Sequence, residues 1–360
     1  GLLLGGLWGT VKLRFTPETD AQRPIEMTAF TPFQVGPPDL AAHKESRKKF
    51  TTDEWLNLLC TSVGYQPDAY PTRRQKLLLF ARLAPLVERN INLLELGPRQ
   101  TGKTFLLRNL SPRVFVVSGG KTSPANLFVN LATKAVGILG TRKVVVFDEI
   151  AHATFPDEDS TVTMLKDFME SGTFTRGSMS FASDAGVVMS GNIDVTDGMP
   201  HSRYRHLLEP LPDILEDTAF QDRIHAYLPG WEIPKIGPDS MATGVGFVTD
   251  HFGEVLVKLR EDSFIDRVRA LQFQQGLTKR DMTAIERVGS GLLKIIHPHG
   301  EASQQELEEV VDLASEMRQR IHNQLVKLAP GEFKPKVIGR AGLEKHAAAD
   351  LARPITLGLN

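Results

Sequence analysis

The sequence predicts an α/β fold, in which a parallel sheet flanked by helices is followed by a small helical domain. Three observations lead to this fold class. From residue 91 onward, short apolar runs of strand length alternate with amphipathic segments, and after about residue 240 only helical patterns remain. Before residue 40, two short alternating segments enclose a turn-rich stretch. Short continuous apolar runs are typical of strands buried on both faces, as they are in a parallel sheet.

The first 90 residues carry the signals of two strands and two helices. Val11–Phe15 alternates apolar and polar residues, Ile25–Phe33 does so more loosely, and Pro and Thr punctuate the stretch between them. Thr51, with Glu54 three residues later, has the spacing of a capping box and predicts the start of a helix. We expect a second helix over Arg73–Arg89.

The central part of the chain contains the predicted sheet. The expected strands are Ile91–Leu96, Val114–Ser118, Val144–Phe147 and Val187–Ser190. The expected helices between them are Lys103–Leu110, Pro124–Val136 and Val162–Glu170. Strands that alternate with helices in this way are typical of βαβ units, whose strands pair in parallel.

The chain therefore divides into four predicted regions. Residues 1–40 are interpreted as the remnant of an N-terminal β domain with its linker, and residues 41–240 as the α/β core with its preceding helices. Residues 241–330 form the helical lid domain, and residues 331–360 a tail or a truncated next domain. The expected lid helices are 247–260, 265–274, 279–296 and 303–328.

Composition excludes several classes of protein. The 360 residues carry a net charge of -1, so binding of a polyanion must come from local patches or from a pore. The one cysteine, Cys60, excludes a disulfide framework and a cysteine zinc cluster. No apolar stretch reaches the roughly 18 residues of a membrane span, so we expect a cytoplasmic protein. The chain does not begin with Met, which leaves open a fragment or a natural short form.

A phosphate-binding motif follows the first strand of the predicted sheet. The pattern G-x-x-x-x-G-K-[ST] is matched in full by Gly97, Pro98, Arg99, Gln100, Thr101, Gly102, Lys103 and Thr104. Glycines let the backbone wrap around phosphates, so that N–H groups at the helix N-terminus point at them. We expect Lys103 to reach the β- and γ-phosphates and Thr104 to hold Mg²⁺. The motif predicts ATP and Mg²⁺ as cofactors.

Two later strands end in polar residues that suit ATP hydrolysis. Asp148 and Glu149 follow a buried strand about 45 residues after the motif. Asp148 is expected to bind Mg²⁺ together with Thr104, and Glu149 to deprotonate the attacking water. Asn192 ends the next strand and is expected to position that water.

Two arginines are candidates for charge stabilisation. Arg223 is expected to reach the γ-phosphate in a neighbouring subunit, with Arg203 and Arg205 as alternates. Arg280 is the candidate lid arginine that contacts ATP within the same chain, and Arg287 is its rival.

The order of these features resembles an AAA+ ATPase, and further segments resemble the BrxL family, the Lon-like ATPases of bacterial BREX phage-defence systems. The resemblance spans about residues 7–330. It rests on Trp8–Gly9, Phe50–Trp55, Arg74–Leu79, Leu94–Arg99, Ser118–Lys121, Phe147–Glu149, Ser171–Gly177 and Phe220–Lys235.

The resemblance implies a homo-oligomeric ring, with six subunits as the expected number, that binds double-stranded DNA and acts with other BREX proteins. It also implies a core similar to MCM-type motors and a Lon-protease-like domain. We find no Ser-containing protease loop with a partner Lys, so we do not expect proteolysis by this chain.

A predicted hairpin is the candidate DNA contact. Ser171–Ala182 is punctuated by glycine, and in MCM-like motors a hairpin at this location points into the pore. Arg176 in the hairpin and Lys121 are expected to meet phosphates, unless Arg176 pairs with a carboxylate at a subunit interface. Two alternative functions stay open: a protein unfoldase that feeds a protease domain, and an ATP-gated DNA clamp without motor activity.

Overall fold

The computed structural model describes residues 9–15, 25–32, 38–118, 122–155 and 158–342. The chain forms two units, Gly1–Pro38 and Asp39–Asn360, and each is described by itself. In the first unit, strands β1 (Gly9–Phe15) and β2 (Ile25–Pro32) pair antiparallel, as the alternating pattern predicts. Trp8 and Phe33, which the sequence analysis also used, lie outside the described residues.

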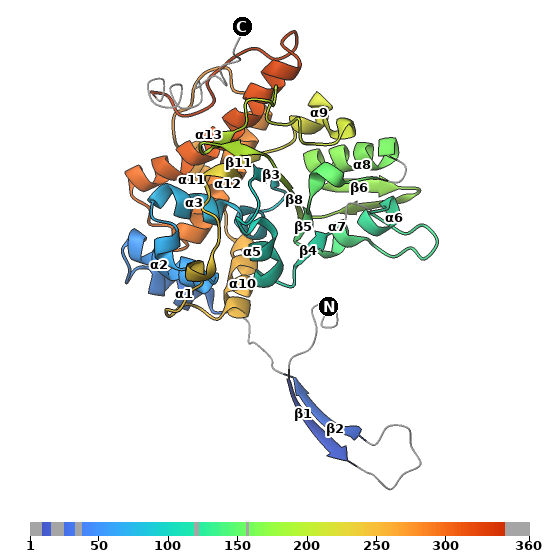
Figure 1. The fold of residues 1–360 in the computed structure, drawn as a ribbon, viewed down its shortest axis with the longest axis vertical. Helices are drawn as coiled ribbons and strands as arrows, with labels where there is room; N and C mark the ends of the chain where they lie inside the picture. Colours follow the sequence, from blue (N-terminus) through green and yellow to red (C-terminus); the bar gives the residue numbers. More distant parts are fainter. Residues whose placement is uncertain (1–8, 16–24, 33–37, 119–121, 156–157, 343–360) are drawn as a thin grey trace. The chain divides into compact units, whose positions relative to one another are not determined.

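A five-stranded parallel sheet forms the centre of the second unit, which confirms the predicted fold class (Figure 1). The strand order is β11-β3-β8-β5-β4. The strands are β3 (Asn92–Gly97), β4 (Val114–Val117), β5 (Val144–Phe147), β8 (Gly186–Asn192) and β11 (Ala226–Pro229). Four of them match predicted strands. The edge strand β11 is a correction, because the sequence analysis found no strand there.

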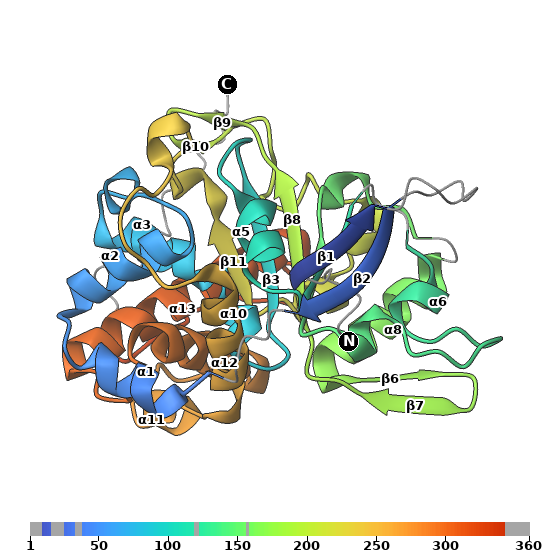
Figure 2. The same cartoon turned by 90° about the horizontal axis from the view of Figure 1, so that it is seen from below.

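Helices cover both faces of this sheet (Figures 1 and 2). One face packs against α2 (Thr52–Ser62), α3 (Arg73–Ala81), α4 (Ala84–Val87), α5 (Lys103–Leu110), α10 (Thr249–Lys258) and α12 (Lys279–Ile296). The other face packs against α6 (Pro124–Leu127), α7 (Ile138–Thr141), α8 (Glu158–Ser171) and α9 (Thr218–Gln221). Helix α13 (Gln304–Leu328) contributes to both cores.

The apolar run of β5 illustrates why the sheet is buried on both sides. Successive side chains of a strand point to opposite faces. Val144 and Val146 therefore belong to the core under α4 and α12, whereas Val145 and Phe147 belong to the core under α8. All four side chains are buried, so both faces demand apolar residues and the strand shows no alternation.

One predicted helix is divided in two. The sequence analysis expected a helix over Arg73–Arg89, but the structure has α3 and α4 with a break at Arg82 and Leu83. Pro85 explains the break, because its ring removes a backbone donor and clashes with the carbonyl of the preceding turn. The predicted capping box at Thr51 and Glu54 is confirmed at the start of α2.

The helix predicted over Pro124–Val136 is wrong beyond its first turn. Helix α6 ends at Leu127, and Val129 instead pairs with Val136 across a turn. The Asn130 side chain accepts hydrogen bonds from the N–H groups of the residues two and three positions later. Such a local side-chain bond competes with the helix and favours a turn.

The C-terminal helices form, but two of them are shorter than predicted. The expected 247–260 and 265–274 helices shrink to α10 and α11 (Ile265–Arg269), whereas α12 and α13 match their predictions. Phe273 pairs with Arg340 in a β-bridge, and Ile338 is buried. Ile338 and Arg340 thus pack against the helical region, where they contact Gln319 and Asp312 of α13. The predicted boundaries between core, lid and tail stay a prediction.

Two general expectations can be compared with the described residues. Cys60 is buried, and burial raises the pKa of its thiol to about 12, as expected of a core residue. Among the described residues, none of the helices combines the length and apolar character that crossing a bilayer requires.

Two strand ends approach each other closely at the start of the phosphate-binding motif. A Cβ atom on Gly230 would lie 2.7 Å from the carbonyl oxygen of Leu96, and one on Gly97 would lie 2.6 Å from the Gly230 backbone. Both contacts are with backbone, which cannot move aside as a side chain does. Glycine is therefore required on each side of this contact.

We expect Gly230→Ala to lower the free energy of unfolding by about 1–3 kcal/mol, the usual cost of overpacking. The control is Gly237→Ala, because a Cβ there meets nothing within 4 Å and φ is not positive. Chemical denaturation of both variants measures the difference. Equal stability of the two variants would contradict the close-approach argument.

Candidate active site

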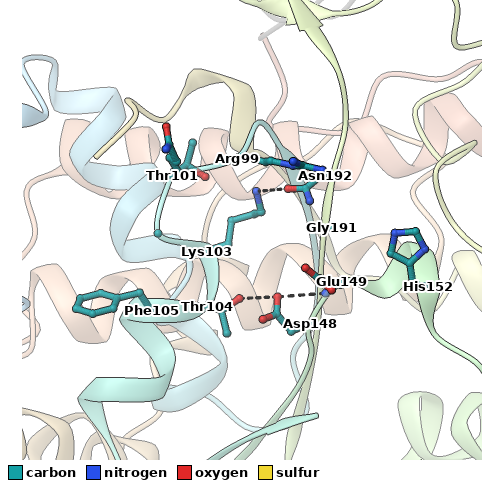
Figure 3. A pocket seen from close by; sticks show the side chains of 12 residues that line it. Arg99, Thr101, Lys103, Thr104, Phe105, Asp148, Glu149, His152, Gly191 and Asn192 are labelled. Atoms are coloured by element: carbon teal, nitrogen blue, oxygen red, sulfur yellow. Dashed lines mark hydrogen bonds between the residues drawn. The ribbon is translucent and has the colours of Figure 1, made fainter. Parts of the chain in front are cut away.

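A polar cavity of about 520 Å³ lies at the carboxyl ends of β3, β5 and β8 (Figure 3). Its lining comprises Arg99, Gln100, Thr101, Gly102, Lys103, Thr104, Phe105, Asp148, Glu149, His152, Gly191 and Asn192. Six of the eight residues of the phosphate-binding motif are among them. Gly97 and Pro98 do not line the cavity, since they form the strand end and the first bend behind it.

The register of the sheet brings the predicted residues together. Gly97, the last residue of β3, is paired with Asn192, the last residue of β8. Asp148 follows β5, the other neighbour of β8, and its N–H donates to the Val117 carbonyl at the end of β4. The motif, the acidic pair and the asparagine thus meet at one edge, as predicted.

The loop before α5 has the backbone shape that phosphate binding requires. Gly102 caps α5 with φ of 71°, in the left-handed region, and Gln100 also has φ of 69°. This positive φ favours glycine, and a Cβ on Gly102 would also lie 2.4 Å from Ile236 Cδ1 and 2.6 Å from Tyr65 Oη. Lys103 and Thr104 open the helix, whose N-terminal N–H groups and dipole favour a phosphate.

Lys103 is held by its own loop. Its Nζ donates to the carbonyl oxygens of Pro98 at 2.7 Å and Gly97 at 3.1 Å, and to Asn192 Oδ1 at 3.2 Å (Figure 3). Burial lowers the pKa of the Lys103 ammonium, and the negative charge of Glu95 opposes that effect. A bound polyphosphate would supply the full negative charge that the ammonium lacks here.

The acidic residue Asp148 has the partners of a magnesium site. Its Oδ1 accepts the hydroxyl of Thr104 at 2.6 Å and that of Ser190 at 2.9 Å. A hydroxyl beside a carboxylate at the mouth of a phosphate-binding loop fits the oxygen ligands that Mg²⁺ prefers. When bound, Mg²⁺ would neutralise charge on the phosphates, with Thr104 and Asp148 holding it.

Glu149 is placed differently from its neighbour. It adopts φ of 54°, an uncommon value for a residue with a side chain, and it is exposed toward the cavity. Strained backbone of this kind concentrates at functional positions. With the carboxylate free of the bonds that hold Asp148, Glu149 suits a base that takes a proton from water.

Four residues at the site were not identified from the sequence: Phe105, His152 and Gly191 line the cavity, and Ser190 contacts a lining residue without lining the cavity itself. Ser190 supports Asp148, and Phe105 and His152 lie on opposite sides of the site (Figure 3). Phe105 directly follows the motif, and its side chain is 51% exposed. Proximity in sequence to Thr104 and Glu149 was the only signal for Phe105 and His152, because neither belongs to the motifs.

The two candidate arginines lie outside the cavity. Arg223 forms an ion pair with Glu170 at 3.2 Å, and Arg280 binds Glu170 at 2.8 Å and Asp222 at 2.7 Å. The structure therefore does not bring Arg280 to the cavity of its own chain. The rival Arg287 donates to the Asn90 carbonyl and does not line the cavity either.

The predicted hairpin is confirmed as β6 (Thr173–Arg176) and β7 (Met179–Ala182), which pair antiparallel. Arg176 near its tip is half-buried and donates to the Val129 carbonyl at the base of the 130–135 turn. A Cβ on Gly177 would lie 3.2 Å from Leu131 Cδ2, so the hairpin tip and the turn lie side by side. Lys121 lies outside the described residues.

Comparison with known proteins identifies a family. A family model described as "Lon-like protease BrxL-like, ATPase domain" matches residues 25–338. The protein named Lon-like protease BrxL from Escherichia coli O9:H4 (strain HS) is 40% identical over 334 residues, which are 92% of this chain and 48% of the relative. Its namesake from Bacillus cereus (strain H3081.97) is 39% identical over 336 residues, 92% of this chain and 49% of the relative. The chain spans about half the length of these curated relatives.

We expect Glu149→Gln to retain binding of MgATP and to lose turnover by roughly 10²–10⁴, the usual contribution of a general base. Phosphate release and equilibrium titration with MgATP measure the two effects separately. The control is Glu45→Gln, an exposed carboxylate on α1 (Leu40–Arg47), which should hydrolyse ATP normally. Near-normal turnover of Glu149→Gln would mean that another group is the base.

Proposed function

The chain belongs to the family of BrxL-like ATPase domains of Lon-like proteases, and from this membership we propose that it hydrolyses ATP as a homo-oligomeric ring on duplex DNA. ATP hydrolysis then drives translocation or remodelling of the DNA. The observation that carries the proposal is the composition of the cavity. One chain supplies an ammonium group, a hydroxyl, carboxylates and an amide to its lining. Among the described residues, no arginine from outside the phosphate-binding loop lines it.

A neighbouring subunit would complete such a site. Phosphoryl transfer gains from a cation that reaches the γ-phosphate, often supplied in trans. Arg223 precedes β11 and is paired with Glu170, a carboxylate that also binds Arg280. Because Arg280 continues to neutralise Glu170, Arg223 can leave that pair for a neighbour's nucleotide without leaving Glu170 uncompensated. Assembly then becomes a condition of activity.

Two adjacent loops support contact with DNA. The tip of the β6–β7 hairpin carries Arg176, and the neighbouring 130–135 turn carries Lys134, which is exposed and has φ of 56°. A ring repeats each cation once per subunit, so a chain of net charge -1 can line a basic channel. Arg176, Lys134 and Lys121 are the proposed phosphate contacts.

The biological role that we propose is phage defence, together with other BREX proteins. This role rests on the family resemblance of the motifs. The chain corresponds to only about half the length of its curated relatives, so the role of the whole relatives is not carried over directly. The whole relatives are named proteases, which supports a second candidate, an unfoldase that feeds a protease domain. Leu131, 48% exposed at the tip of the turn, is the kind of apolar residue that grips unfolded polypeptide.

The decisive test compares ATP turnover alone, with duplex DNA, and with a permanently unfolded protein. Stimulation by the duplex supports the DNA-acting ring, and stimulation only by the unfolded protein supports the unfoldase. Absence of duplex binding at both low and moderate salt would sink the leading proposal. Tracking of single particles on DNA separates a motor, which travels directionally with ATP, from a clamp, which only diffuses.

A mixing experiment tests the shared site. We expect Arg223→Ala and Lys103→Ala each to abolish turnover in a uniform ring. In mixed rings, a nucleotide site of an Arg223→Ala subunit can face the intact Arg223 of a Lys103→Ala subunit, so partial activity should return. Arg203→Ala and Arg205→Ala are the matched controls. Recovery with one of these, and none with Arg223→Ala, would reassign the trans arginine.

The double variant Arg176→Ala/Lys134→Ala tests the proposed DNA-binding loops. Its affinity for duplex DNA should fall, and the slope of log K against log salt should become shallower by on the order of one for each phosphate that is no longer neutralised. Arg113→Ala removes an exposed cation paired with Glu254, remote from both loops in sequence, and serves as control. An unchanged salt slope in the double variant would exclude these two loops as the DNA-binding surface.

A further inference from the structure

A buried ion pair lies behind the phosphate-binding loop. Arg82 follows the last residue of α3, and Glu95 lies in β3, two residues before Gly97. The guanidinium donates to both carboxylate oxygens of Glu95, from Nη2 to Oε1 at 2.6 Å and from Nε to Oε2 at 2.9 Å. Arg82 is 1% and Glu95 2% exposed. Such a bidentate ion pair fixes the plane of the guanidinium.

The remaining guanidinium nitrogen of Arg82, Nη1, contacts the loop itself. Its Nη1 donates to the carbonyl oxygen of Thr101 at 2.9 Å, and Thr101 is completely buried. The Thr101 carbonyl and the Gly102 N–H belong to one planar trans peptide, so they point in opposite directions. A donor that holds the carbonyl on the buried side therefore turns the Gly102 N–H toward the cavity, where phosphates bind.

Three other carbonyls of the loop are held as well, but by different groups. The Ile236 N–H donates to the Gln100 carbonyl at 2.7 Å, while Lys103 holds those of Gly97 and Pro98. When Lys103 turns to a phosphate, its two bonds to the loop break. Arg82 then remains as the charged side chain that anchors the loop from behind.

We propose that Arg82 is a positioning residue for phosphate recognition, and that Glu95 holds its guanidinium so that the Gly102 N–H points into the cavity. The proposal rests on nucleotide binding by the loop. Neither side chain touches the nucleotide. We expect them to affect recognition of the β- and γ-phosphates. AMP ends at the α-phosphate and contacts fewer N–H groups of the loop, so its binding should depend less on this pair.

If the ion pair only stabilised the fold, its replacement would change the unfolding temperature but not the preference for ADP over AMP. Replacing a buried ion pair by apolar residues of similar volume is often neutral for stability, whereas removing one partner is costly. The variant Arg82→Met/Glu95→Leu therefore removes the anchor with little expected cost in folding. A matched control pair is Lys294 with Glu88, joined at 2.9 Å, in which Lys294 is completely buried. The control variant is Lys294→Met/Glu88→Leu.

The experiment titrates MgATP, MgADP and AMP into the 360-residue chain and its variants, and records thermal unfolding in parallel. For the unmodified chain we expect ADP to bind more tightly than AMP. Arg82→Met/Glu95→Leu should lose about tenfold or more in affinity for ATP and ADP while its affinity for AMP changes little. The control variant should keep the unmodified ratio of ADP to AMP affinity.

Two conservative variants keep the test informative if the double variant fails to fold. Lysine can pair with Glu95 or reach Thr101, but it lacks the planar fork, so Arg82→Lys should retain folding and lose part of the ADP preference. Glu95→Gln keeps the shape and one acceptor, and should do the same. Folded variants with an unchanged ratio of ADP to AMP affinity overturn the proposal. If the unmodified chain binds ADP no better than AMP, the nucleotide site itself is misassigned and the proposal falls with it.

Discussion

The parallel pairing of β3 with β8 is the interaction on which the site depends. It sets Gly97 opposite Asn192, so that the start of the phosphate-binding loop and the amide at the end of β8 share one edge. The pairing of β8 with β5 adds Asp148 to the same edge. A slip of one residue would turn Asn192 to the other face of the sheet. The two packed cores make such a slip costly, because every apolar side chain of the strand would change face.

The same sheet links the two halves of the proposed shared site. Strand β11 pairs with β3, so the residues before β11 lie beside the strand that leads into the loop. Asp222 is held there by Arg280 of α12 and Arg318 of α13, and Arg223 by Glu170 of α8. Arg318 also binds Asp281; burial alone would raise the pKa of that carboxyl, but Arg318 and Lys336 hold it at about 2. The helical layer thus sets where Arg223 stands.

The motifs with strict spacing were predictable from the sequence, and features that depend on tertiary contacts were not. The loop residues, Asp148, Glu149 and Asn192 meet as expected because parallel strands end at one edge. Strand β11 was missed, since four residues with a terminal proline carry no period of their own. Helix α6 was overextended because the Asn130 bonds oppose an otherwise helical pattern. Arg82 and Glu95 gave no signal, because a charged residue in an apolar run reveals its partner only in three dimensions.

The hydrogen bonds of Lys103 have a consequence for the end of a catalytic cycle. The ammonium has three acceptors waiting in its own chain, two loop carbonyls and the Asn192 amide oxygen. When a product phosphate leaves, the Lys103 ammonium can donate to these three oxygens instead of to the phosphate. The ammonium is therefore not left without hydrogen-bond acceptors after release. The emptied loop is thereby kept intact for the next nucleotide. Oxygens of the protein and oxygens of the product phosphate thus compete for the same ammonium, and this competition favours release of the product.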